Sequence, residues 1–136
     1  MSASEIFFDT NVLMYFASTE AVKAQRSDEL LRAGGVVSVQ VLNEFAASAR
    51  RKYALPWASI RVVLAAVRAT CAVVPLTETT HELGLVLAER HVLNVYDGMI
   101  VAAAQLAGCE TLYSEDMHDG LVIDQLTIRN PYSKLP

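Results

Sequence analysis

Four acidic residues of this chain could together carry metal-dependent chemistry: Asp9, Glu44, Asp97 and Asp116. Carboxylates gathered at one site repel one another, so they need a cation or shared protons to coexist. Hard oxygen ligands of this kind suit Mg²⁺, for which Mn²⁺ can substitute. An ion held in this way can bind and polarise a phosphodiester and generate hydroxide near neutral pH. The four acids therefore indicate hydrolysis of a phosphodiester bond.

Two of these acids follow predicted strands. Asp9 comes directly after a β-favouring run at Ile6–Phe8, and Asp116 lies in the loop after a strand at Thr111–Tyr113. Strands alternate with helices along the chain, which indicates an α/β fold with a mainly parallel sheet. In such sheets the ligand crevice lies beyond the carboxyl ends of the strands. We therefore expect both acids at that crevice.

The other two acids lie on predicted helices. Ser38 is a plausible N-cap for a helix that runs to about Tyr53 and carries Glu44 near its second turn. Asp97 opens a helix at Tyr96–Ala107, which is apolar on nearly every side. A helix of that kind is expected to be central and buried. Both acids then belong to segments that begin near the same crevice.

Each acid also has an ordinary explanation when it is considered alone. Asp97 could be a helix cap, and Glu44 could lie on a solvated helix face, although its neighbours are apolar. Asp116 lies close to Glu115 and Asp119, so this segment could be no more than a polar loop. The combination of the four acids, rather than any one of them, favours a shared cation.

The remaining elements follow from apolar periodicity and from glycine, proline and capping signals. We predict helices at Thr10–Ala17, Ala21–Ala33, about Pro56–Thr70 and Thr79–Arg90, strands at Val36–Val37 and Cys71–Val74, and an edge strand at Leu121–Ile123 or Leu126–Ile128. Thr79 and Glu82 have the spacing of a capping box. No repeat, low-complexity segment or linker interrupts the chain, which predicts a single domain over residues 1–136.

Composition excludes several classes of protein. The chain has 136 residues, of which 53% are hydrophobic, and this suits one folded domain and argues against disorder. Its net charge of −4 argues against a protein that wraps DNA through bulk positive charge, but not against a nuclease. Cys71 and Cys109 form no paired motif, so a reduced, cytoplasmic setting is expected. No segment approaches the ~20 apolar residues of a membrane span.

Three segments resemble the signature blocks of PIN domains. They are FFDTNVLMY at Phe7–Tyr15, SVQVLNEF at Ser38–Phe45 and VYDGMIVAAAQLAGCETLYSEDM at Val95–Met117. Their order and separation are similar to those of VapC-type toxin ribonucleases from bacterial toxin–antitoxin pairs, and the resemblance runs from about Ile6 to Ile128. It implies a three-layer α/β/α sandwich with a mainly parallel central sheet of four or five strands.

The resemblance also implies roles for individual residues. The four acids match the metal-holding acids of the family, and Thr10 and Asn11 match the polar pair after the first acid. Ser114 matches the small hydroxyl residue ahead of the fourth acid, and Asp119 falls where an additional acid sometimes occurs. The chemistry of Asn11 suggests a further role, since an amide can hydrogen-bond and orient a neighbouring carboxylate. Asn11 could equally be a local cap.

What the resemblance implies is a Mg²⁺-dependent endoribonuclease that acts as a toxin. Its partners would be an RNA substrate, a small cognate antitoxin and a second copy of the chain, because relatives are commonly homodimers. A metal-activated water would attack the phosphodiester, with no covalent intermediate. Two other interpretations stay open. One is a catalytically silent PIN-like scaffold that binds RNA or protein, and the other is a metal-dependent phosphatase, which expects a second Asp where this chain has Asn11.

The one basic run, Arg50, Arg51 and Lys52, also has two interpretations. Neighbouring residues on a helix point in different directions, so a solvated helix end is the ordinary one. A patch that receives the RNA backbone is the other, because the run lies on the same predicted helix as Glu44. Tyr53 and Trp57 are expected in packing rather than base stacking, and none of the three isolated histidines is assigned to catalysis.

Overall fold

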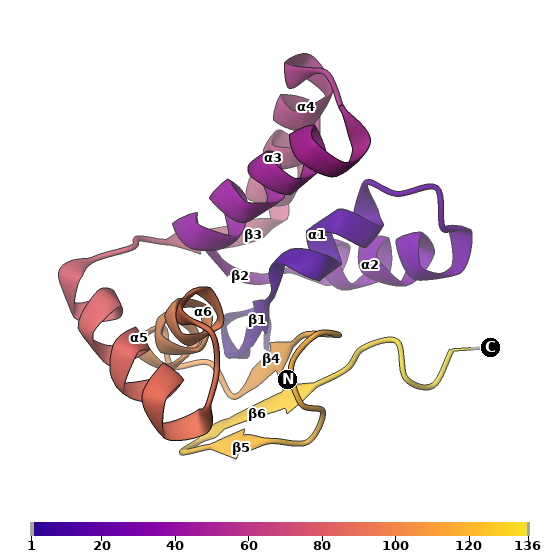
Figure 1. The fold of residues 1–136 in the computed structure, drawn as a ribbon. Coiled ribbons are helices and arrows are strands. Elements are labelled where there is room, and N and C mark those ends of the chain that lie inside the picture. Colours follow the sequence, from indigo (N-terminus) through magenta and orange to yellow (C-terminus); the bar gives the residue numbers. More distant parts are fainter. Residues whose placement is uncertain (1, 136) are drawn as a thin grey trace.

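One mixed sheet forms the centre of the fold, with its strands in the order β3-β2-β1-β4-β6-β5 (Figure 1). A computed structural model describes residues 2–135 of the chain. The strands are β1 (Ile6–Phe8), β2 (Gly35–Ser38), β3 (Cys71–Val74), β4 (Thr111–Tyr113), β5 (Val122–Ile123) and β6 (Leu126–Arg129). Neighbouring strands are parallel except β5 and β6, which are antiparallel.

Helices flank this sheet on both sides. The described residues form a 3₁₀ turn at Ala3–Glu5 and the α-helices α1 (Thr10–Phe16), α2 (Ala21–Ala33), α3 (Val39–Tyr53), α4 (Trp57–Thr70), α5 (Glu78–His91) and α6 (Val95–Leu106). In Figure 1, α1 and α2 lie on one side of the sheet and α5 and α6 on the other, while α3 and α4 form a hairpin near β3. The predicted three-layer α/β/α sandwich with a mainly parallel sheet is confirmed.

The hydrophobic core lies between the sheet and these helices. Phe7 and Phe8 of β1, Leu112 of β4 and Phe45 of α3 have no exposed surface. Helix α6 is buried from its fourth residue, Gly98, as far as Ala104, as expected for a helix that is apolar nearly all round. Burial of one large apolar side chain is worth about 1.5–3 kcal/mol. This core therefore fixes the strands and helices that carry the candidate acids.

The sheet has six strands, so the predicted number of four or five is wrong. Both C-terminal segments that were predicted as alternatives form strands, because they pair with each other as well as with the sheet. Val122 and Ile123 pair with β6, and β6 also pairs in parallel with β4. The two strands are joined by a tight turn in which Asp124 adopts a left-handed backbone with φ +56°, a conformation that Asp tolerates in such turns.

Some helix boundaries also differ from the prediction. The capping box of α5 pairs Thr77 with Thr80 and starts the helix at Glu78, whereas the sequence suggested Thr79 with Glu82. Both pairs have the same spacing, but Thr80 is buried and Glu82 is exposed. Helix α2 and strands β1, β3 and β4 cover the predicted residues. No helix within residues 2–135 has both the length and the apolar character needed to cross a lipid bilayer.

Candidate active site

A cleft of ≈ 350 Å³ lies where β1 and β4 end, next to α3 and the start of α6. Its lining includes all four predicted acids, which are Asp9, Glu44, Asp97 and Asp116. These residues come from four separate segments of the chain, and the parallel topology brings them to one edge of the sheet. The four acids thus lie at one cleft beyond the strand ends, as the sequence predicted.

Asp9 is the most buried of the four acids, with 4% of its surface exposed. It is the N-cap of α1, and its Oδ1 accepts a hydrogen bond from the Thr10 backbone N–H at 2.7 Å. Its Oδ2 accepts from Ser114 Oγ at 2.6 Å and from Asn11 Nδ2 at 3.3 Å. Burial raises the pKa of Asp9 to about 7 against the opposing effect of the Ser114 and Thr10 hydrogen bonds, and the charges of Asp97 and Asp116 raise it further.

Asn11 joins the first and fourth acids through its side-chain amide. Besides Asp9, the Nδ2 group donates to Asp116 Oδ2 at 3.3 Å and lies 3.4 Å from Ser114 Oγ. The Asn11 Oδ1 accepts from the Glu115 backbone N–H at 3.2 Å. The amide therefore holds two carboxylates and the loop after β4 together, which is the orienting role that its chemistry suggested. A local cap would not need these contacts across more than 100 residues of sequence.

Asp97 lies on the third residue of α6, and Asn94, not Asp97, is the N-cap of that helix. The Asn94 side chain accepts from the Asp97 backbone N–H at 2.8 Å and donates to Asp97 Oδ2 at 3.1 Å. Burial and the nearby charge of Asp116 raise the pKa of Asp97, and the Asn94 hydrogen bond opposes them. The N-cap of α6 is thus Asn94 rather than Asp97, and the Asp97 carboxylate lines the cleft.

Glu44 is half-buried on α3 and accepts a hydrogen bond from Gln40 Nε2 at 3.1 Å. Burial raises its pKa against the effect of the Gln40 bond, and the charge of Asp97 raises it further. Ser48 and Lys52 follow at four-residue intervals and line the same cleft. One stripe of α3 therefore forms a wall of the cleft, which rules out a fully solvated face for Glu44.

The acids of the loop after β4 have different environments. Both carboxylate oxygens of Glu115 are occupied, by Tyr15 and by Lys23. Asp119 accepts the Asn130 backbone N–H at 2.9 Å and lines a separate hollow, so the structure does not bring it to the cleft. Asp116 is exposed and makes its side-chain contact with Asn11. Of these three acids, Asp116 is the one presented to the cleft without a cationic partner.

The basic run is divided between two environments. Lys52 is the one basic side chain that lines the cleft among residues 2–135. Arg50 donates from Nη1 to the Leu55 carbonyl oxygen at 2.9 Å, and its guanidinium lies 4.8 Å from the centre of the Trp57 ring. Arg51 is exposed. Arg50 therefore holds the turn between α3 and α4. Trp57, which was expected in core or dimer packing, lies against Arg50 and is 55% exposed, so it is not part of the core.

Sequence reasoning missed several side chains around the cleft. Tyr15 and Ser48 line it, and none of the histidines does so within the described part of the chain. Tyr53 also lines it and is 59% exposed, so the expectation that it packs is wrong. The four-residue interval from Glu44 was a signal that could have found Ser48, because residues four apart share a helix face. No local pattern pointed to Tyr15, whose partner Glu115 lies 100 residues away.

The donor set fits a hard divalent cation that keeps part of its hydration shell. Within residues 2–135, no group of three or more His, Cys, Asp or Glu side chains is arranged to hold a metal by itself. Mg²⁺ commonly binds through one or two carboxylates and several waters, which a wide acidic cleft allows. Thr10 lines this cleft, and its Oγ1 is the one buried side-chain oxygen or nitrogen in the described chain without a hydrogen-bond partner. Buried polar atoms are normally paired, so a further polar species would complete the site.

Comparison with known proteins gives one family and several structural neighbours. The family model for the PIN domain matches residues 6–118. A toxin–antitoxin complex from Klebsiella pneumoniae is similar to this chain with 22% sequence identity and a TM-score of 0.71, over 93% of this chain and 98% of that one. No curated protein matches the sequence.

Two further solved structures have the same fold. VapC20 from Mycobacterium tuberculosis, described as a sarcin-ricin loop cleaving toxin, has 19% identity and a TM-score of 0.68, over 82% of this chain and 89% of its own. VapBC2 from Rickettsia felis, bound to a DNA fragment from its promoter, has 18% identity and a TM-score of 0.65, over 92% of this chain and 97% of that chain. At these identities the similarity establishes the fold.

Proposed function

Since the chain belongs to the PIN domain family, we propose that it is a Mg²⁺-dependent endoribonuclease and the toxin of a toxin–antitoxin pair. The observation that carries this proposal is the convergence of Asp9, Glu44, Asp97 and Asp116 on one cleft. Burial is the main cause of the raised pKa values of the first three acids, and repulsion between the carboxylates adds to it. A divalent cation would relieve that repulsion. The toxin assignment is supported by the neighbours of the same fold, which include toxin–antitoxin complexes.

The side chains of the cleft would have different roles in such a reaction. The four acids hold the cation directly or through water, and a cation bound there supplies an activated water and stabilises developing negative charge. Asn11 and Ser114 fix the orientation of Asp9, and Asn11 also fixes Asp116. Lys52 offers a positive charge to the phosphate backbone from the wall of the cleft. Since water is the nucleophile, no covalent intermediate with the protein is needed.

The proposed substrate is RNA, and the proposed partner is a small antitoxin protein. One neighbour of the same fold is described as cleaving the sarcin-ricin loop, which supports RNA as the substrate class. Substrate choice would depend on surface shape and loop contacts outside the acids. A homodimer is proposed on the family resemblance. The same proposal places the protein in the cytoplasm.

A phosphatase with an aspartyl nucleophile is disfavoured by the chemistry around Asn11. That mechanism expects a second Asp two residues after Asp9, and this chain has an amide there. The amide is already engaged by Asp9, Asp116 and the Glu115 backbone. It is therefore built into the positioning of the carboxylates rather than available as a proton donor to a leaving group.

The proposed function is tested by cleavage of RNA with the purified protein in Mg²⁺ and in EDTA. We expect cleavage in Mg²⁺ alone, and its loss in Asp9→Asn, which removes a charge but keeps the shape of the side chain. Asp119→Asn is the matched control, because this acid lies outside the cleft. A protein that binds RNA but never cuts it would be a silent scaffold. Cleavage by Asp9→Asn at the wild-type rate would contradict the metal site.

A further inference from the structure

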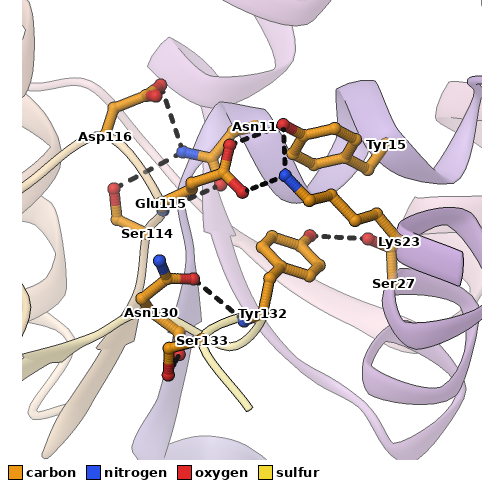
Figure 2. Close-up of polar contacts among 10 residues, drawn as sticks. All are labelled: Asn11, Tyr15, Lys23, Ser27, Ser114, Glu115, Asp116, Asn130, Tyr132 and Ser133. Atoms are coloured by element: carbon orange, nitrogen blue, oxygen red, sulfur yellow. Dashed lines mark hydrogen bonds and ion pairs between the residues drawn. The ribbon is translucent and has the colours of Figure 1, made fainter. Parts of the chain in front are cut away.

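Beside the acid cleft, Glu115 is held by two side chains from distant parts of the sequence (Figure 2). Lys23 Nζ on α2 donates to Glu115 Oε2 at 2.7 Å, and Tyr15 OH on α1 donates to Glu115 Oε1. Lys23 Nζ also donates to the Tyr15 hydroxyl oxygen at 3.1 Å. We call Tyr15, Lys23 and Glu115 the Glu115 clamp. Its three members are mutually hydrogen-bonded, so none of them moves independently.

The C-terminal segment also packs against the clamp. The Tyr132 ring meets the Tyr15 ring edge to face at 5.0 Å, and Lys23 Nζ lies 5.7 Å from the centre of the Tyr132 ring. The Tyr132 hydroxyl is hydrogen-bonded to Ser27 Oγ at 2.6 Å. Lys23 is thus confined between two aromatic rings and a carboxylate. Its side chain has only 29% of its surface exposed, and that of Glu115 has 24%.

The clamp is connected to the acids through the backbone on both sides of Glu115. The preceding residue, Ser114, donates to Asp9 Oδ2, and the following residue is Asp116. The Glu115 backbone N–H donates to Asn11 Oδ1, and the amide of Asn11 in turn donates to Asp116. Fixing the Glu115 side chain therefore fixes the loop that carries Asp116, whose own carboxylate has little else to hold it.

We propose that Lys23 and Tyr15 are positioning residues that, through Glu115, hold Asp116 at the cleft and so set the affinity of the site for a divalent cation. The proposal rests on the proposed function, because it presumes that the cleft binds a metal. Lys23 also neutralises the negative charge of Glu115 and binds its carboxylate. Without Lys23, Glu115 would lose its ion pair, and the loop that carries Asp116 would be held only by the contacts of Ser114 and Asn11.

The test measures Mn²⁺ binding by titration calorimetry, in the absence of RNA and well below the melting temperature. We expect Lys23→Met and Glu115→Gln each to weaken Mn²⁺ affinity roughly 10-fold or more, as is usual when partners of metal ligands are removed. The double variant should bind Mn²⁺ no more weakly than the weaker-binding single variant, because both substitutions remove the same Lys23–Glu115 ion pair. Lys23→Arg, which keeps the charge, should restore most of the affinity.

Arg32→Met is the matched control, since it removes an ion pair with Asp28 from the exposed side of the same helix. It should leave Mn²⁺ affinity unchanged. The melting temperature of every variant in EDTA separates a general loss of stability from a change at the site. A Lys23→Met protein with lowered stability but wild-type Mn²⁺ affinity would overturn the proposal, and so would a wild-type protein that binds no Mn²⁺. Affinity is measured without RNA, so a failure of cleavage contradicts only the proposed function.

Discussion

Among the residues of the cleft, Asp9 is the most deeply buried, with 4% of its surface exposed. Three donors surround its carboxylate, yet burial and two neighbouring negative charges still hold its pKa at about 7 instead of 3.8. A group with a raised acid pKa binds more protons in the folded state than in the unfolded chain. Its contribution to folding stability is therefore greatest at low pH and is lost as the pH rises from about 4 to about 7.

We expect Asp9→Asn to change the pH dependence of stability when no metal is bound. Relative to wild type in EDTA, the variant should gain stability progressively from about pH 4 through pH 7, and the gain should level off above about pH 8. Its size is a few kcal/mol at most, because one pKa unit corresponds to about 1.4 kcal/mol. Urea unfolding at several pH values measures it. A stability gap between Asp9→Asn and wild type that is flat across this range would contradict the raised pKa.

At the level of elements, the start of α6 is placed by a close contact with α5. A Cβ atom on Gly98 would lie 2.4 Å from the backbone carbonyl oxygen of Gly84 and 2.9 Å from Ala88 Cβ. A Cβ atom on Gly84 would meet mainly the side chain of Met99, with its sulfur at 2.6 Å. A thioether can move aside, whereas a helix backbone cannot do so without shifting the helix. The residue next to Asp97 is thus glycine for a steric reason.

Gly98→Ala should therefore be more destabilising than Gly84→Ala. We expect a loss of about 1–3 kcal/mol for Gly98→Ala, which is typical of overpacking, and a smaller loss for Gly84→Ala. Thermal melts of the two variants test the order. An added Cβ at Gly98 would push α6 away from α5 and move Asp97 with it. Gly98→Ala should therefore also weaken Mn²⁺ binding in calorimetry. Equal melting temperatures for the two variants would show that α5 and α6 separate easily here.

The basic residues of α3 face different surroundings, and this leads to a further prediction. Lys52 faces the cleft, and Arg50 holds the Leu55 carbonyl and the Trp57 ring. Lys52→Ala should reduce the slope of log affinity for RNA against log salt by about 0.7, with no change in melting temperature. Arg50→Ala should lower the melting temperature. Replacing Arg50, Arg51 and Lys52 together should do both.

RNA binding in this series is best measured in the Asp9→Asn background, so that the substrate stays intact. Fluorescence anisotropy at several salt concentrations gives the slope for each variant. An unaltered slope in the triple variant would assign the basic run to a solvated surface or to a partner interface.

Elements defined by short-range signals could be predicted from the sequence, and those defined by pairing could not. Helix α2 ends at Gly34, which adopts φ +90°, and Ser38 caps α3 through the Val41 backbone N–H, so both boundaries followed from single residues. The strands β5 and β6 were predicted only as alternatives, because neither is stable without the other and without β4. Spacing alone could not distinguish Thr77 from Thr79 as the cap of α5, since burial of Thr80 decides between them.

For the molecule as a whole, the same division applies to the candidate site. Asp9, Asp97 and Asp116 could be predicted because each lies close to a strand end or a helix start, and parallel topology gathers such positions at one edge. Glu44 lies one turn further along α3, on a face that its apolar neighbours indicated. The Glu115 clamp could not be predicted, because its side chains pair across 92 and 100 residues with no repeated spacing. Topology thus collects negative charge from the whole chain into one cleft, while long-range ion pairs decide which carboxylates remain available. Such a concentration of charge must affect the stability of the entire fold.

The repulsion among the four acids makes a prediction for global stability that depends on metal. Two unit charges ~4 Å apart interact by about 4 kcal/mol at an effective dielectric constant near 20. Even a small part of that is large against the roughly 5–15 kcal/mol that stabilises a typical domain. Asp97 is the central charge of the group, since it raises the pKa of both Asp9 and Glu44 and is itself affected by Asp116. Removing its charge relieves three neighbours at once.

Asp97→Asn should therefore melt at a higher temperature than wild type in EDTA at pH 7.5. The favourable interaction of the Asp97 carboxylate with the N-terminus of α6, about 0.3–1 kcal/mol, opposes this gain but is smaller than the relieved repulsion. Millimolar Mg²⁺ should narrow or reverse the difference, because the ion binds the folded wild-type protein better than the variant. Asn94→Ala is the matched comparison: it removes the cap of α6 and keeps all four charges, so it should lower the melting temperature with and without Mg²⁺. Paired thermal melts of the three proteins in EDTA and in Mg²⁺ decide the matter. If Asp97→Asn melts below wild type in EDTA, the carboxylate serves mainly the helix, and the four acids do not form one mutually repelling site.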